Sequence, residues 1–110
     1  MDISIRDMDS IKVVEIVGNV DAETAPKAEE QINPLASPGS KVILDLSRVP
    51  FMSSVGLRML LIVYRHFNWK EGRLLLAGLP QSLKKAMTDT GFLEQFALAD
   101  TVEEGVAALS

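Results

Sequence analysis

Two short apolar runs separated by a helical pattern constrain the fold of this chain more than any other feature. Residues 41–46 and residues 73–77 are apolar enough to form strands that are covered on both faces. Between them, a strongly apolar segment that starts at about Ser54 and extends to Asn68 or Trp69 predicts a helix. A strand, a helix and a second strand in this order predict a right-handed crossover within a mostly parallel sheet.

The segments on either side continue the alternation of strands and helices. Residues 3–6 and 11–17 predict two strands, and the turn residues Asp9 and Ser10 between them predict a hairpin. Three further helices and a short fifth strand complete the order, at about residues 25–32, 81–90, 101–109 and 95–98. The sequence therefore predicts one α/β domain over residues 1–110. Its sheet has four to five mostly parallel strands with an antiparallel N-terminal edge strand, and four helices pack against it.

Local signals predict where several helices begin and end. Thr24 is the expected N-cap of the first helix. Asp100 and Glu103 predict a capping box at the start of the last one. Gly91 followed by Phe92 predicts that the preceding helix ends in a Schellman motif. Each signal gives an expected boundary that can be compared with the structure.

Length, charge and composition narrow the classes of function. The chain has 110 residues, the size of one domain, and its net charge of −4 with eleven scattered Lys and Arg residues argues against a nucleic-acid partner. It has no cysteine, which excludes disulfides and thiolate metal sites and agrees with a reducing compartment. Residues 1–6 lack a signal-peptide pattern, and no apolar run is long enough to span a bilayer. We therefore expect a cytoplasmic protein that does not insert into membranes.

The chain offers no constellation of catalytic residues. It has no Gly-x-Gly-x-x-Gly sequence, no P-loop and no metal-ligand spacing, so we expect no cofactor and no metal. His66, the one histidine, follows Ser54 by twelve positions. On a helix this places the two side chains about 120° and roughly 18 Å apart, which excludes a Ser-His dyad. Phe67 and Trp69 are interpreted as core or helix-end packing. We expect a protein that is not an enzyme.

The loop before the long helix carries two hydroxyl groups, those of Ser53 and Ser54. A helix N-terminus has unpaired N–H groups and a partial positive charge, so it tolerates a phosphate well. Ser54 is therefore a candidate phosphoacceptor, and the other interpretation is a hydroxyl that caps the helix. The helix itself is apolar almost all round, which indicates either a well-buried helix or an exposed partner face beside the serines.

The serine loop and its surroundings resemble a known family. Their pattern is similar to the STAS domain, and more narrowly to the anti-sigma factor antagonists of bacterial partner-switching systems. In those proteins a strand ends in Asp-Leu-Ser, an aromatic residue follows, and Asp-Ser-Ser/Ala-Gly-Leu-Gly opens an apolar helix. The matching residues here are Val42, Ile43, Leu44, Asp45, Leu46, Ser47, Val49, Phe51, Met52, Ser54, Gly56 and Leu57, together with Gly18, Val20, Asp21, Phe92 and Phe96.

The resemblance implies a cycle of binding and phosphorylation. It places the phosphorylated serine on Ser54, with Ser53 as the second candidate. It implies that the partner is an anti-sigma factor that is also a serine kinase using ATP, and that a metal-dependent Ser/Thr phosphatase restores the free serine. The unphosphorylated form binds the kinase and releases the sigma factor, and we expect that form to be a monomer when free. The residues expected to bind the partner are Asp21, Ser53, Ser54, Val55, Gly56 and Arg58.

Three positions depart from the family pattern. Ser53 replaces an Asp, Val55 replaces a small residue, and Arg58 replaces a Gly. Arg58 follows Ser54 by one helical turn, so it either reaches a phosphate there or is an ordinary surface arginine. The missing Asp also leaves an alternative open. In this alternative the chain is a STAS-like docking subunit of a membrane transport or other signalling complex that acts without serine phosphorylation.

Overall fold

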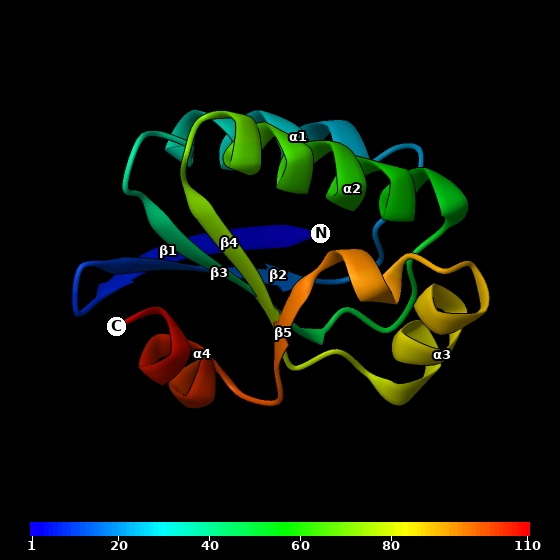
Figure 1. The fold of residues 1–110 in the computed structure, drawn as a ribbon. Coiled ribbons are helices and arrows are strands. Elements are labelled where there is room, and N and C mark those ends of the chain that lie inside the picture. Colours follow the sequence, from blue (N-terminus) through cyan, green and yellow to red (C-terminus); the bar gives the residue numbers. More distant parts are fainter.

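The computed structural model describes all 110 residues, and its elements follow the predicted order (Figure 1). Five strands form one sheet, and four α-helices and two short 3-10 turns connect them. The strands are β1 (Asp2–Met8), β2 (Ile11–Val17), β3 (Lys41–Arg48), β4 (Arg73–Ala77) and β5 (Ala97–Ala99). The helical elements are α1 (Ala25–Ile32), η1 (Asn33–Leu35), α2 (Ser54–Trp69), α3 (Gln81–Asp89), η2 (Leu93–Gln95) and α4 (Val102–Leu109).

The sheet has the simple spatial order β1-β2-β3-β4-β5. β1 pairs with β2 in antiparallel fashion, and every other neighbouring pair is parallel. The hairpin turn has Asp9 and Ser10 at φ 50° and 68°, the left-handed conformations that a two-residue turn between twisted strands requires. The predicted α/β class, the parallel sheet and the antiparallel edge strand are all confirmed.

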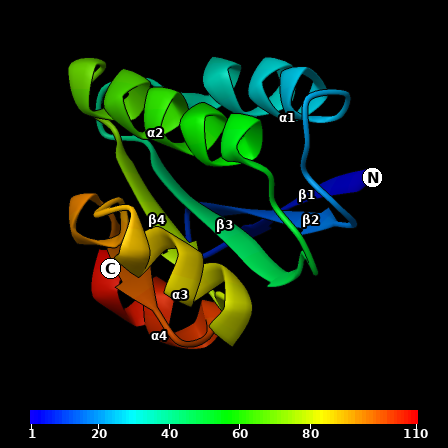
Figure 2. The same cartoon turned by 90° about the vertical axis from the view of Figure 1, so that its right-hand side faces the viewer.

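Helices cover both faces of the sheet (Figures 1 and 2). α1 and α2 lie side by side on one face, and α4 lies on the other. The larger core, 21 buried residues, lies beneath α1 and α2 and includes Leu83 and Met87 of α3. A smaller core of seven buried residues lies beneath α4. No helix combines the length and apolar character needed to cross a membrane.

Helix ends follow the sequence signals in part. The Schellman motif is confirmed, because Phe92 N–H donates to the Met87 carbonyl and Gly91 N–H to that of Thr88. The expected capping box at Asp100 is wrong by one residue. Val102 is buried in the smaller core and begins α4, so the cap falls on Thr101, whose Oγ1 accepts from Glu104 N–H. The fifth strand is also displaced, since the 3-10 turn η2 takes up residue 95.

The two aromatic residues near the end of α2 have different environments. Phe67 is fully buried in the larger core, as expected. Trp69 is 77% exposed, so the expectation that it packs in the core or at the helix end is wrong. Two residues advance a helix by about 200°, which turns Trp69 away from the sheet that Phe67 faces. The Trp69 ring instead lies 5.2 Å from the Lys70 ammonium.

Candidate functional site

The loops after β2 and β3 meet at one end of the sheet, beside the start of α2. Gly18 N–H donates to the Arg48 carbonyl at 3.0 Å, and Val20 N–H donates to the Phe51 carbonyl at 3.0 Å. Ser53 N–H donates in return to the Val20 carbonyl at 2.9 Å. The carboxyl ends of parallel strands are where α/β proteins commonly place their sites. These bonds bring the predicted residues around positions 21 and 54 into one corner of the molecule.

Ser53 is the N-cap of α2. Its backbone is extended, with φ −73° and ψ 172°, and its Oγ accepts a hydrogen bond from Gly56 N–H at 3.3 Å. Its carbonyl accepts from Leu57 N–H at 2.9 Å. The capping role that the sequence offered to Ser54 therefore belongs to Ser53, because α2 begins at Ser54, one residue earlier than a cap at Ser54 requires.

Ser54 is the first residue of α2 and its side chain is exposed. Its hydroxyl makes no hydrogen bond, in contrast to the half-buried hydroxyl of Ser53. The following residue, Val55, is 44% exposed. Of the two predicted acceptors, Ser54 thus presents the free and accessible oxygen.

Gly56 allows α2 to start close to the neighbouring loop. It is buried, and a Cβ at this position would lie 2.8 Å from the Val20 carbonyl oxygen, closer than real Cβ contacts. The structure therefore gives Gly56 a packing role. It holds Ser53, Ser54 and Val55 against the loop after β2 and presents no side chain of its own to a partner.

Asp21 organises the turn that leads into α1. Its Oδ1 accepts from Glu23 N–H at 3.0 Å and from Thr24 N–H at 3.1 Å. These bonds, the one from Thr24 first, hold the pKa of Asp21 below its ordinary value. Thr24 occupies the N-cap position but caps no helical N–H, since its hydroxyl donates to the Asn19 carbonyl and accepts from Asp21 N–H. The predicted capping by Thr24 is thus replaced by the Asp21 turn.

Asp21→Asn should weaken the fold at neutral pH and have no effect in acid. A carboxyl whose pKa is lowered on folding stabilises the protein above its unfolded pKa, and the contribution is lost as the pH falls through the folded pKa. Denaturant unfolding at about pH 7 and about pH 2 checks this. Asp2→Asn is the matched control, because the Asp2 side chain is exposed and its carboxylate makes no hydrogen bond, and this variant should be as stable as the parent at both pH values. An unchanged pH profile in Asp21→Asn would contradict the assigned role.

Exposed apolar side chains flank the serine corner on two sides. Phe51 is 55% exposed and Ile62 is 45% exposed, and Val55 lies seven residues before Ile62 on the same face of α2. One shallow groove of about 170 Å³ is lined by Ala25, Pro26, Glu29, Val55, Arg58, Met59 and Ile62. Another, of about 250 Å³, is lined by Pro50, Phe51, Met52, Ser82, Leu83 and Ala86.

The sequence did not single out Phe51 and Ile62 as site residues. α2 is apolar almost all round, so its pattern could not tell the face that packs on the sheet from the face that α1 leaves open. The one available signal was the proximity of Phe51 to the two serines. Exposed apolar surface next to a polar centre is typical of protein interaction sites.

Two other polar residues from the sequence analysis, Arg58 and Asp45, lie in different parts of the structure. Arg58 is exposed, follows Ser54 by one turn and takes part in neither of the two ion pairs in the structure. Asp45 is buried, and its Oδ1 accepts from the Ser47 hydroxyl at 2.7 Å and the Ser47 N–H at 3.1 Å. Asp45 thus has a structural role, because it holds the backbone near the end of β3.

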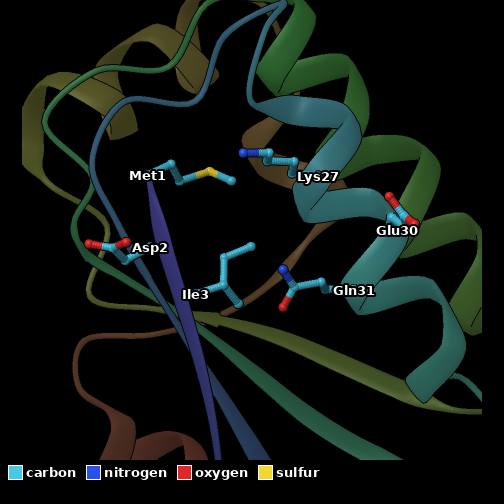
Figure 3. A pocket seen from close by; sticks show the side chains of 6 residues that line it. All are labelled: Met1, Asp2, Ile3, Lys27, Glu30 and Gln31. Atoms are coloured by element: carbon cyan, nitrogen blue, oxygen red, sulfur yellow. The ribbon is translucent and has the colours of Figure 1, made fainter.

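A wider hollow of about 540 Å³ lies elsewhere, between the edge strand β1 and α1 (Figure 3). Met1, Ile3 and Gln31 point toward it, and Lys27 lies at its upper end. Its lining includes no residue of the loop before α2 or of α2 itself, and it contains no cluster of groups suited to catalysis. The serine corner is the better candidate because the free hydroxyl, the exposed apolar side chains and an unpaired arginine are all found there.

Comparison with known families and proteins gives matches over most of the chain. The family model for the STAS domain matches residues 2–105. An anti-sigma-B factor antagonist of Listeria monocytogenes is 30% identical over 104 residues, which cover 94% of this chain and 85% of that protein.

Solved structures show the same architecture. The crystal structure of an anti-sigma factor antagonist from Mycobacterium paratuberculosis matches with a TM-score of 0.86 and 28% identity, over 98% of this chain and 92% of the other. The phosphorylated form of the Bacillus cell fate determinant SpoIIAA matches with a TM-score of 0.71 over 99% of this chain and 100% of the other. Because its identity is only 18%, that likeness concerns the fold alone.

Proposed function

The chain belongs to the STAS domain family, in the group of the anti-sigma factor antagonists, and on that premise we propose that it is a phospho-regulated member of this group. In its unphosphorylated form it binds an anti-sigma factor that is also a serine kinase, and so releases the sigma factor. Phosphorylation of Ser54 by that kinase, with ATP, abolishes the binding. The observation that carries the proposal is the exposed Ser54 hydroxyl, which makes no hydrogen bond and is close in the chain to the exposed apolar residues Phe51 and Val55.

The choice of Ser54 over Ser53 follows from their hydrogen bonds. The Ser53 hydroxyl oxygen is half-buried and already accepts a hydrogen bond from Gly56 N–H, so it is less accessible to a kinase. Phosphorylation of Ser54 breaks no bond, and the phosphate would extend from the first turn of α2, where the helix dipole favours negative charge.

The phosphate would act on the interface and leave the fold intact. It adds a charge of about −1.5 to −2. Phe51 and Val55 are exposed beside Ser54, so a partner that covers them would also remove water from the phosphate. Removing water from a charge is costly even where the charge has a partner, and a few kcal/mol lowers affinity by a factor of about 100 or more.

The serine at position 53 is compatible with this function. The family pattern has an Asp there, and Asp and Ser are equally good N-cap residues. Ser53 keeps the capping bond to Gly56 N–H, so the local backbone does not depend on the missing carboxylate. What changes is the charge next to Ser54, which is neutral in this chain.

The remaining parts of the proposal follow from family membership. Anti-sigma factor antagonists are regulatory binding proteins, and we infer that this chain is likewise a substrate and partner without catalytic activity. A metal-dependent Ser/Thr phosphatase regenerates the active form. The protein works in the cytoplasm, as a monomer when free, without nucleic acid or cofactor. We infer that the contact surface includes Asp21, Ser53, Ser54, Val55 and Arg58, and that the buried Gly56 supports it by packing the start of α2 against the loop after β2.

A reconstituted release assay tests the function. Labelled sigma factor is bound to the anti-sigma kinase from the same source, and release is followed as unphosphorylated or phosphorylated chain is added. The proposal predicts release by the unphosphorylated chain alone. Equal release by both forms would favour a docking subunit that acts without phosphorylation. If neither form released the sigma factor, the proposed function would be contradicted.

A further inference from the structure

We propose that Arg58 binds the phosphate on Ser54 within the same molecule and so sets how long the phosphorylated form persists. The proposal rests on the proposed function in one respect, namely that Ser54 is the residue that carries the phosphate. The role assigned to Arg58 follows from the geometry of α2 in this chain. The family pattern has a glycine at this position, which has no side chain that could contact a phosphate.

The helix brings the two side chains together. Side chains four residues apart on a helix are neighbours, with Cβ atoms about 5–6 Å apart. Helical side chains also lean toward the N-terminus, so the stem of Arg58 is directed toward the turn that carries Ser54. A guanidinium group matches two phosphate oxygens at once, which makes arginine well suited to this contact.

Arg58 is available for this contact. Its side chain is exposed, and it makes no ion pair and no hydrogen bond in the unphosphorylated structure. Nor does the neighbouring cap compete with a phosphate, because Ser53 is neutral. An Asp at position 53 would place a negative charge beside the phosphate, so the neutral cap and the arginine shift the local charge in the same direction.

Other charged groups around the corner act less directly. The Asp21 carboxylate is already held by the Glu23 and Thr24 amides. Glu29 of α1 lines the same groove as Arg58 but makes no ion pair with it. Glu23 precedes α1 and Arg48 ends β3, and the other charged residues of α1, Lys27 and Glu30, line the hollow beside β1. Of these groups, only Glu29 shares a groove with Arg58.

The test uses the full chain with phosphoserine incorporated at position 54 during synthesis, so that it needs no kinase. The second ionisation of phosphoserine has a pKa of about 6, and a nearby cation favours the dianion and lowers that pKa. In a phosphorus NMR titration at about 0.1 M salt, Arg58→Gln should raise the second pKa of the phosphoserine by about a third of a pH unit. The same variant should lose its phosphate faster to a broad-specificity protein phosphatase.

Two further variants separate a local contact from a general charge effect. Arg65→Gln removes the same charge from the same helix, but Arg65 is exposed and lies about 16 Å farther along the helix axis than Ser54. The phosphate on Ser54 should therefore titrate in this variant as it does in the parent. Arg58→Lys should retain part of the shift, because it keeps the charge without the planar fork. Parent-like titration of Arg58→Gln, or an equal shift in Arg65→Gln, would overturn the proposal.

The outcome is distinguishable from failure of the proposed function. If a kinase phosphorylates Ser54 but Arg58→Gln titrates like the parent, only the role of Arg58 falls. If no kinase modifies Ser54, the proposed function falls, although the pairing of a synthetic phosphoserine with Arg58 can still be measured.

Discussion

Ser54→Asp should bind the anti-sigma kinase at least about 100-fold more weakly than the parent protein, a loss of about 3 kcal/mol. The aspartate places a permanent negative charge at the first residue of α2, between the exposed apolar side chains of Phe51 and Val55. A partner that covers those side chains would have to remove water from this charge, which is costly. Titration calorimetry with the purified kinase measures the change.

Two controls make this result specific. Ser54→Ala should bind like the parent, because the hydroxyl makes no hydrogen bond in the structure. Ser54→Asp should melt no lower than the parent, since an acidic residue in the first turn of a helix is favourable by about 0.3–1 kcal/mol. Equal affinities for Ser54→Ala and Ser54→Asp would contradict a charge switch and favour constitutive docking.

Phe67→Ala should lower the free energy of unfolding by about 3–5 kcal/mol. Phe67 is fully buried in the core between α2 and the sheet, so its removal leaves a cavity as well as losing apolar burial. A domain of this size is stable by only about 5–15 kcal/mol, and the loss is therefore a large part of the total. Denaturant unfolding followed by circular dichroism gives the value.

The matched control lies two residues away on the same helix. Trp69→Ala removes a larger aromatic side chain, but one that is 77% exposed, so the expected cost is less than about 1 kcal/mol, including its contact with Lys70. A large loss of stability in Trp69→Ala, or a small one in Phe67→Ala, would show that α2 packs on the sheet with a different face.

The sequence predicted the architecture because local signals and apolar patterns agree along most of the chain. The runs at 41–46 and 73–77 became β3 and β4, and the turn at Asp9 and Ser10 joined β1 to β2. The errors lie at ends, where neighbouring candidates are chemically equivalent. Thr101 and Asp100 both suit an N-cap, and only the burial of Val102 selects Thr101.

The candidate site was predicted in composition but not in detail. The motif located the two serines, but whether Ser53 or Ser54 caps α2 depends on where the loop crosses Val20, a contact from a distant part of the chain. The exposure of Ile62 and Trp69 likewise depends on how α1 and the sheet cover α2. The capping bond to Ser53 turned out to be the observation that separates the two hydroxyls.

The most direct test of the central claim is to map the phosphate. The parent, Ser53→Ala and Ser54→Ala are incubated with Mg-ATP and a kinase-containing fraction from the source of the protein, then analysed by intact-protein and peptide mass spectrometry. The account predicts one added phosphate on the parent and on Ser53→Ala, located on Ser54, and none on Ser54→Ala. A phosphate that persists in Ser54→Ala, or no phosphate on any of the three proteins while a partner still co-purifies, would contradict it.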